Sequence, residues 1–510
     1  MIKAPDISTP TLATKGPVLS FSFAKRHGAL VGGMEEGGVL RIYHRADLPL
    51  PILLELRRRF RRPLRLTELA PGPFEEMLRR TFEAGSSQAM EEMESLEEDM
   101  DMDLASAADA IGEPRDLAES ADDAPIIRLI NALVTEAVKK GASDIHLEPY
   151  EDRLSVRFRV DGVLRKVLEP KRALAPLIAS RVKVMARLDI AEKRLPQDGR
   201  ISLRIAGRPV DVRVSTLPTG HGERVVMRLL DKQAGRLGLE ELDMMPSIRD
   251  ALNRLIHRPN GIILVTGPTG SGKTTTLYAV LRKLNETTRN IMTVEDPIEY
   301  ELEGIGQTHV NTKVDLTFAR GLRAILRQDP DIVMVGEIRD VETARIAVQA
   351  SLTGHLVLST LHTNSAIGAV ARLKDMGVEP YLLSSSLAGV LAQRLVRMLC
   401  QECKVPRKVS AQEWGDLALT DGPWSAIPDQ LYRPKGCDAC LGSGFAGRAG
   451  IYELVPIDDT LKGLIHDNAG ERDLTSHART FTTSLRDDGL RLLHSGRTTI
   501  EEIMRVTRED

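Results

Sequence analysis

Residues 261–275 constrain the fold of this chain most, because an apolar, β-branched run breaks there into glycines and then into a helical pattern. Residues 267–274 fit the pattern G-x-x-x-x-G-K-[ST] of a phosphate-binding loop. In such a loop backbone N–H groups approach the phosphates, Lys273 reaches the β and γ oxygens, and the Thr274 hydroxyl ligates Mg²⁺. A chance match is the competing interpretation, but the flanking strand and helix are the context that the motif requires. The nucleotide-binding residues are therefore predicted to be Gly267, Pro268, Thr269, Gly270, Ser271, Gly272, Lys273, Thr274 and Thr275.

Length and composition limit the class of protein. At 510 residues the chain is too long for one core, and about 150 residues per domain predicts three or four domains. A net charge of −3, with nine Phe, seven Tyr and two Trp, argues against a nucleic-acid partner, which usually shows as a basic domain with exposed aromatics. The N-terminus lacks a signal pattern, and no apolar run approaches the ~18 residues that span a bilayer. We expect a cytoplasmic protein.

The first 124 residues divide into a basic unit and an acidic segment. Residues 1–90 contain strand-like pieces at 29–31 and 39–43 and a helical pattern at 51–60. The arginines around this helix favour either a solvated face or a docking surface for an acidic partner or an anionic membrane, and the sequence does not decide between them. Residues 91–124 hold fourteen Asp or Glu against one basic residue, Arg115, which predicts a flexible acidic linker.

Residues 125–235 read as a small α+β domain. Apolar residues at helical spacing predict a helix over 125–140, and alternation over 154–160 before Asp161-Gly162 predicts a β-hairpin. A second alternating pair, 201–205 and 210–214, flanks a turn around Gly207, with a helix near 174–188 between the hairpins.

Residues 245–395 repeat one theme of a buried strand followed by a helical pattern. The strands are predicted at 261–266, 291–294, 332–335 and 356–360. Such alternation implies an α/β domain with a mostly parallel sheet and helices on both faces. The remaining residues, 396–510, hold the cysteines and then amphipathic helical patterns such as 501–506.

Position along a strand separates candidate active-site residues from structural ones, because ligands of such sheets bind beyond the carboxyl ends of the strands. Glu337 lies at the carboxyl end of its strand, whereas Asp331 lies at the start of the same strand. Six residues separate Asp331 from Glu337, which places the two about 20 Å apart. Glu295 and Asp296 also follow a strand, so one carboxylate is expected to activate water and another to hold Mg²⁺. We assign the base to Glu337, with Glu295 as the alternative.

Two histidines, His355 and His362, lie at opposite ends of the predicted strand in the segment 354–362. His362 lies at the carboxyl end of its strand and is predicted to sense the γ-phosphate. His355 lies at the other end, and a structural role for it is equally open.

The four cysteines form two tight pairs. Four Cys in 510 residues are not a disulfide framework, but Cys400-x2-Cys403 and Cys437-x2-Cys440 have the spacing of a tetrahedral structural Zn²⁺ site. Four buried thiols without metal are the alternative. A redox role is disfavoured because neither pair opens a helix after a strand.

Four ordered motifs resemble those of the secretion ATPases that power type II secretion and type IV pilus assembly. They are the loop 267–274, an acidic box at 294–299, a Walker B-like segment at 327–340 and a His box at 353–364. The resemblance covers nearly all of 125–510 and implies a RecA-like ATPase domain and a homo-hexamer. It also implies that arginines of the domain 125–235 reach the nucleotide. Arg213 and Arg228 match best, and Arg200 matches less well.

The cysteine pairs resemble those of the type II secretion and pilus assembly ATPases and argue against the retraction ATPase. Between the two that remain, the segment 17–28 makes the type II secretion ATPases the better resemblance, with pilus assembly as the alternative. The resemblance then implies an ATPase that drives pseudopilus assembly, peripheral to the inner membrane. Its expected partners are the cytoplasmic domain of the L-type protein and the F-type platform protein. The alternative from a different functional class is a nucleotide-gated scaffold, which binds ATP without useful turnover. The predicted units are a docking domain 1–90, a linker 91–124, an α+β domain 125–235, the ATPase domain 245–395, a zinc-binding subdomain 396–445 and a helical region 446–510.

Overall fold

The computed structural model divides the chain into two compact units, residues 1–232 and 233–510. Each unit is described by itself. The structure describes residues 19, 23–24, 27–34, 38–46, 48–70, 72–74, 77–78, 125–205, 208–231, 237–409, 414, 428 and 430–507. The predicted linker 91–124 and the turn around Gly207 lie outside the described residues.

The N-terminal part of the first unit is a three-stranded sheet in the order β1-β2-β3. Its β1 and β2 are antiparallel, whereas β2 and β3 are parallel and joined through helix α2. The two predicted strand-like pieces and the predicted helix are confirmed. The elements are β1 (Ala29–Met34), β2 (Leu40–His44), α2 (Leu50–Phe60) and β3 (Leu64–Glu68).

The second part of this unit is a six-stranded antiparallel sheet in the order β6-β5-β4-β9-β8-β7. Helices α5 and α6 pack on it over a shared apolar core. The predicted hairpin at Asp161-Gly162 is confirmed, and both residues have positive φ, as a tight hairpin turn requires. The elements are α5 (Pro125–Lys139), β4 (Ala142–Pro149), β5 (Leu154–Val160), β6 (Val163–Leu168), α6 (Leu174–Met185), β7 (Gln197–Ile205), β8 (Arg208–Thr219) and β9 (Gly222–Asp231).

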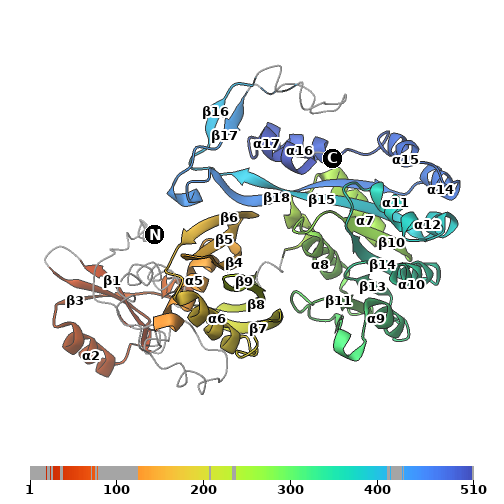
Figure 1. Ribbon diagram of the computed structural model, residues 1–510. Coiled ribbons are helices and arrows are strands. Elements are labelled where there is room, and N and C mark those ends of the chain that lie inside the picture. Colours follow the sequence, from red (N-terminus) through yellow and green to blue (C-terminus); the bar gives the residue numbers. More distant parts are fainter. Residues whose placement is uncertain are drawn as a thin grey trace. The chain divides into compact units, whose positions relative to one another are not determined.

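The second unit is built on a seven-stranded sheet in the order β12-β11-β13-β14-β10-β15-β18 (Figure 1). All neighbours are parallel except β15 and β18. Residues of β10 alternate between two apolar cores, so helices cover both faces, as predicted. The strands are β10 (Gly261–Thr266), β11 (Ile291–Glu295), β12 (Gly306–His309), β13 (Ile332–Val335), β14 (Leu356–Leu361), β15 (Leu387–Leu399) and β18 (Phe445–Pro456).

The helices between the strands follow the predicted strand-helix alternation. They are η4 (Leu239–Leu242), α7 (Pro246–Ile256), α8 (Lys273–Leu284), η5 (Thr312–Val314), α9 (Phe318–Ile325), α10 (Val341–Leu352), α11 (Gly368–Asp375) and α12 (Pro380–Ser386). Helix α9 begins with a Thr317 cap and α10 with an Asp340 cap, each of which accepts a bond from a first-turn N–H group.

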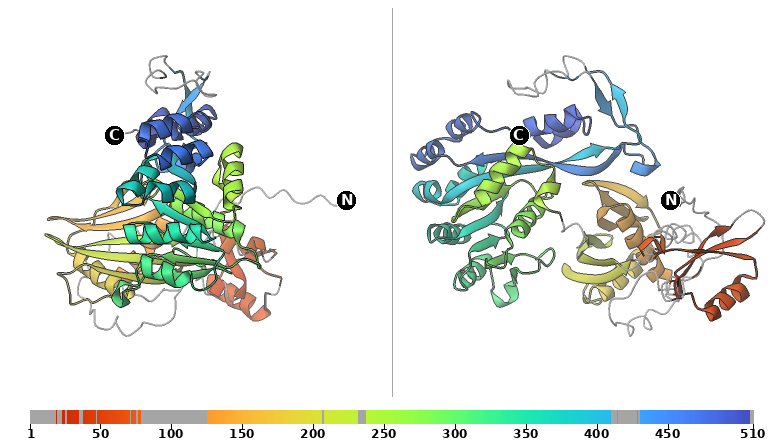
Figure 2. Two further views of the ribbon diagram at one scale, coloured as in Figure 1. Left: turned by 90° about the vertical axis from the view of Figure 1, so that its right-hand side faces the viewer. Right: turned by 180° about the vertical axis from the view of Figure 1, so that it is seen from behind.

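The sheet is wider than the sequence patterns predict. Strand β15 runs to Leu399, past residue 395, and pairs with β18, so the region 446–510 begins with a strand of the main sheet. Of the helices that follow, α16 and α17 pack on these strands, whereas α14 packs against α12 (Figure 2). The helices that follow β18 are α14 (Asp459–His466), α15 (Glu471–Ala478), α16 (Leu485–His494) and α17 (Ile500–Thr507), and α17 confirms the predicted amphipathic helix.

Candidate nucleotide-binding and catalytic site

The phosphate-binding loop lies between β10 and α8, at the carboxyl edge of the parallel sheet. Gly267 has a φ of 151°, and a Cβ there would lie 2.5 Å from the Gln393 carbonyl oxygen, so only glycine fits. Gly272 has a φ of 89° and forms the N-cap of α8 without a side-chain cap, which leaves the first helical N–H groups for a ligand.

Lys273 points back into this loop. Its Nζ donates to the carbonyl oxygens of Gly267 at 2.8 Å and Pro268 at 3.1 Å. Burial lowers the pKa of Lys273; the charge of Glu337 opposes this shift and the charge of Arg394 adds to it, with a resulting pKa of about 8. The Oγ of Ser271 is buried and has no hydrogen-bond partner among the described residues. The loop thus holds hydrogen-bond donors from which the oxygens of a phosphate group can accept.

Glu337 lies just beyond β13, and His362 just beyond β14, so the neighbouring strands bring the two together. The Nε2 of His362 is 3.5 Å from Glu337 Oε2, and Arg339 donates a hydrogen bond to the other carboxylate oxygen. Burial lowers the pKa of His362, as does the charge of Lys273, so its ring is neutral at pH 7. Lys273, Glu337 and His362 therefore meet at one edge of the sheet.

Glu295 lies at the same edge, but its carboxylate is already engaged. It is buried and accepts hydrogen bonds from Thr293 Oγ1 at 2.6 Å, from Gln307 Nε2 at 3.1 Å and from the Tyr278 hydroxyl. A base at this position would have to release donors that satisfy it in the buried interior. Asp296 follows it and is exposed.

Asp331 and His355 lie at the opposite end of the sheet, as predicted. The Oδ2 of Asp331 accepts a hydrogen bond from the Asn290 N–H at 2.7 Å. The Nδ1 of His355 is 2.8 Å from the Ala350 carbonyl oxygen, so its ring helps to close the C-terminal end of α10. Both contacts are structural.

The three arginines of the first unit form a row across β7, β8 and β9. Arg200 is opposite Arg213, and Arg213 is opposite Arg228, so the three lie in one row across three neighbouring strands of the sheet. Arg228 Nε donates to Asp144 Oδ1 at 2.9 Å. Burial alone would raise the pKa of Asp144, but the hydrogen bonds of Arg228 and Ser143 lower it, so the pair is charged.

Two residues of β15 contribute to the loop surroundings and were missed by the sequence analysis. Gln393 Oε1 accepts a hydrogen bond from Thr276 Oγ1 of α8 at 2.7 Å. Arg394 NH2 donates to the Asn364 carbonyl oxygen at 2.7 Å. The sequence does contain a signal for them, a Gln-Arg pair inside the otherwise apolar run 387–396. Their place beside the phosphate loop, however, depends on the parallel pairing of β15 with β10, which the sequence pattern does not show.

The cysteine pairs come together beside a short antiparallel pair, β16 (Val405–Arg407) and β17 (Leu431–Arg433), which follows the first pair and precedes the second. All four Sγ atoms lie within 4.8 Å of one another, and none is in a disulfide. Three of the Sγ–Sγ distances are 3.7 Å for Cys403–Cys440, 3.7 Å for Cys437–Cys440 and 3.9 Å for Cys400–Cys437. A Zn–S bond of ~2.3 Å in a tetrahedron gives S–S edges of about 3.8 Å, so the donor set fits Zn²⁺. The second pair also forms the short helix η6 (Asp438–Cys440).

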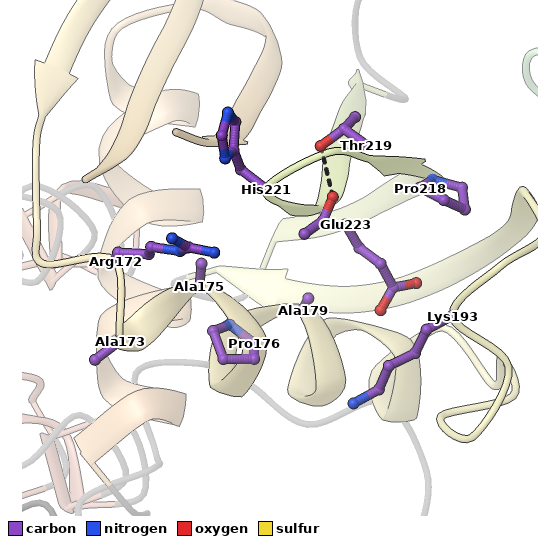
Figure 3. A pocket seen from close by; sticks show the side chains of 11 residues that line it. Arg172, Ala173, Ala175, Pro176, Ala179, Lys193, Pro218, Thr219, His221 and Glu223 are labelled. Carbon is purple, nitrogen blue, oxygen red and sulfur yellow. Dashed lines mark hydrogen bonds between the residues drawn. The ribbon is translucent and has the colours of Figure 1, made fainter. Parts of the chain in front are cut away.

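A cavity of about 510 Å³ lies elsewhere, between α6 and the β8–β9 turn of the first unit. Figure 3 shows Arg172, Lys193, His221 and Glu223 around it, with alanines of α6. None of the predicted nucleotide residues lines this cavity, so it is not the predicted nucleotide site.

Within the described part of the chain, no helix combines the length and apolarity that crossing a lipid bilayer demands.

Two family models match the chain. The model described as "Type II/IV secretion system protein" matches residues 119–505, and a model of an N-terminal domain of "GSPII protein E" matches residues 18–82. The chain is 60% identical to "Type II secretion system protein E" of Pseudomonas aeruginosa, over 99% of each chain. It is 58% identical to "Type II secretion system ATPase E" of Vibrio cholerae, over 96% of this chain and 97% of the relative.

Solved structures support the fold. The pilus retraction motor PilT with bound ADP is 28% identical, with a TM-score of 0.51 over 74% of this chain and 96% of that chain. The Legionella pneumophila ATPase DotB, at 20% identity and a TM-score of 0.54 over 74% of this chain and 95% of that chain, shares the fold.

Proposed function

We propose a function on the premise that the chain belongs to the type II/IV secretion system protein family, which its family match and full-length relatives establish. The protein hydrolyses ATP, and this hydrolysis drives pseudopilus assembly and protein export by a type II secretion system. The names of the relatives at 60% and 58% identity support type II secretion over pilus assembly.

The observation that carries the proposal is the meeting of Lys273, Glu337 and His362 beside a glycine loop. The loop fits a triphosphate on two grounds. The buried Ser271 Oγ lacks a partner among the described residues, and the crowded Gly267 and Gly272 leave room for backbone only. A scaffold that binds nucleotide without turnover has no use for a histidine-supported carboxylate next to the lysine.

Each residue has a role in the proposed reaction. The Thr274 hydroxyl and a nearby carboxylate would hold Mg²⁺, which would supply charge neutralisation for the phosphates. Lys273 exchanges its two carbonyl partners for phosphate oxygens. Glu337 orients the attacking water and accepts its proton, while Arg339 and His362 hold the carboxylate. Glu295 supports the site from its buried network.

The arginine row gives a reason for assembly. Arg213 and Arg228 belong to the first unit and the phosphate loop to the second, so we propose that domain closure or a neighbouring subunit of a homo-hexamer brings these arginines to the nucleotide. Specific ATPase activity should then fall on dilution through the monomer–oligomer transition. Activity that stays constant would contradict this part of the proposal.

We assign Zn²⁺ to Cys400, Cys403, Cys437 and Cys440, on the strength of their S–S distances. Metal-binding energy then folds this small subdomain in place of an apolar core. Elemental analysis of freshly purified protein should find about one zinc ion per chain. A zinc content well below one per chain would contradict the assignment.

The N-terminal sheet supports an interaction at the inner membrane. Exposed Leu50 and Leu54 lie on α2, whose last turn carries Arg57, Arg58 and Arg59. We propose that this domain binds inner-membrane type II secretion proteins, the cytoplasmic domain of the L-type protein and the F-type platform protein, and so keeps a cytoplasmic protein peripheral to the inner membrane. Deleting residues 1–90 should preserve basal ATPase activity and release the protein from the membrane fraction.

The function as a whole is tested in the protein's own host. A chain with Lys273→Ala should be made at normal levels yet fail to restore export to a deletion strain. Phosphate release by the purified wild-type protein is the companion measurement. Export that is restored in full by this variant, or wild-type protein that releases no phosphate, would overturn the proposed function.

A further inference from the structure

Arg394 occupies an unusual position at the base of the phosphate loop. In the parallel pairing of β10 with β15, Thr266 is opposite Ala392, so Arg394 lies at the level where β10 has become the loop. A Cβ on Gly267 would be 3.1 Å from Arg394 NH1. The guanidinium therefore packs against the first residue of the loop.

The other neighbour of Arg394 is the segment that carries His362. Arg394 NH2 donates to the Asn364 carbonyl oxygen at 2.7 Å and approaches Asn364 Oδ1 at 3.3 Å. The same segment is joined to the end of β10, because the Thr363 N–H donates to Thr266 Oγ1 at 3.0 Å. Arg394 thus lies between the loop that binds phosphate and the residues that follow the proposed γ-phosphate sensor.

Arg394 is a buried charge without an ion pair among the described residues. It is 6% exposed, and its hydrogen bonds go to neutral oxygens of Asn364 and Gln393. The charge of Glu453, on the adjacent strand, interacts with the Arg394 guanidinium only beyond ion-pair distance. The carboxylate of Glu453 instead forms an ion pair with Arg479 at 3.0 Å. A guanidinium stays protonated at neutral pH, so its burial is costly unless an anion balances it.

Arg397, three residues further along the same strand, has its charge compensated by an ion pair within the chain. Its NH2 is 2.5 Å from Glu502 Oε1, and its guanidinium lies over the Phe445 ring at 4.2 Å. The half-buried arginine of β15 is therefore neutralised by the chain itself, whereas the fully buried arginine beside the phosphate loop is not.

We propose that Arg394 is a further positioning residue of the ATP site, which holds the Asn364 segment beside the loop and whose buried positive charge is balanced by the bound triphosphate. Together with Lys273 it makes the base of the loop a region of two buried cations. The inference rests on the proposed ATPase function, because it takes ATP to be the anion. Binding should then depend on the charge of Arg394 and increase with the number of phosphates on the ligand.

The test uses the full-length protein and two variants. Arg394→Gln keeps a donor for the Asn364 carbonyl but removes the charge, whereas Arg394→Lys keeps the charge. We expect Arg394→Gln to weaken binding of a non-hydrolysable ATP analogue by on the order of tenfold, with a smaller loss for ADP. Arg394→Lys should stay within about threefold of wild type for both ligands, because the Coulomb contribution remains. Without nucleotide, the melting temperature of Arg394→Gln should be at least that of wild type, because an unbalanced buried charge is gone, and that of Arg394→Lys should be similar to wild type.

The control is Arg397→Gln, which removes a paired charge from the same strand. It should lower the melting temperature while leaving the affinity for the ATP analogue unchanged, because Glu502 is its partner.

Several outcomes would overturn the inference. These are wild-type affinity for the ATP analogue in Arg394→Gln, equal losses for ATP analogue and ADP, no rescue by lysine, or a glutamine variant that fails to fold, which would show a structural role. Failure of the proposed function looks different, because the wild-type protein itself would not bind the ATP analogue.

Discussion

Buried charges at two places in the second unit, Lys273 with Arg394 and Glu502 by itself, differ in how they are compensated. At the phosphate loop, Lys273 and Arg394 are buried, and among the described residues no carboxylate is within ion-pair distance of either. Between β15 and α17, Glu502 is 2.5 Å from Arg397 and 2.8 Å from Arg505. A paired buried charge stabilises the folded chain once it is in place, whereas an unpaired one disfavours folding until a ligand arrives. The comparison separates groups kept for ligand binding from groups kept for structure.

Lys273→Ala tests the unpaired charges of the phosphate loop and should have the largest effect on ATP turnover. Removing a charge that contacts the transferred phosphoryl group should lower ATP turnover at least about a thousandfold. The melting temperature of the nucleotide-free protein should be no lower than that of wild type, because the lysine has no ion pair to lose and its unpaired buried charge disfavours folding. Phosphate release and thermal unfolding give the two numbers. A large loss of stability with residual turnover would place Lys273 among the structural charges.

Glu337→Gln should slow turnover by about a hundredfold while nucleotide binding is retained, because the amide cannot accept the proton of water. Glu295→Gln is the matched control at the neighbouring strand. Three donors hold Glu295, so its replacement should instead cost about 1–3 kcal/mol of unfolding free energy. Wild-type turnover in Glu337→Gln, with turnover lost in Glu295→Gln, would transfer the role of base to Glu295.

Glu502→Gln should reveal a stability contribution with a defined pH window. Burial alone would raise the pKa of Glu502, but the hydrogen bonds of Arg397 and Arg505 lower it to about 2. Because the folded pKa lies below the unfolded one, the contribution is present above about pH 4.5 and is lost as the pH falls toward 2. We expect a loss of roughly 2–3 kcal/mol at pH 7 and a shrinking difference between variant and wild type in acid. Urea unfolding at several pH values measures it, and a difference independent of pH would contradict the assignment.

Asp331→Ala should have the smallest effect. This carboxylate accepts one bond from the Asn290 N–H at the end of the sheet opposite the phosphate loop. Its loss should cost about 1 kcal/mol and leave ATP turnover unchanged. A variant with normal stability and impaired turnover would mean that this end of the sheet takes part in the reaction.

Some features followed from short stretches of sequence. The glycine loop and Lys273 are consecutive with the strand and helix that place them, so local pattern was enough. Glu337 and His362 are 25 residues apart in number, yet they could be placed together, because the carboxyl ends of neighbouring parallel strands meet at one edge. The hairpin at Asp161-Gly162 was predictable because its turn chemistry is local.

Sequence patterns were therefore enough to predict the phosphate loop, the parallel strands around it and the edge of the sheet at which polar residues gather. Which of those polar residues already have hydrogen-bond partners depends on the tertiary fold. Strand β18 pairs with β15 across more than forty residues, and Arg394 reaches Asn364 over 30 residues. Arg228 reaches Asp144 over 84 residues. Partners this distant leave no periodic signal, because the side chain that neutralises a charge is chosen by strand register and burial, which exist only in the folded chain.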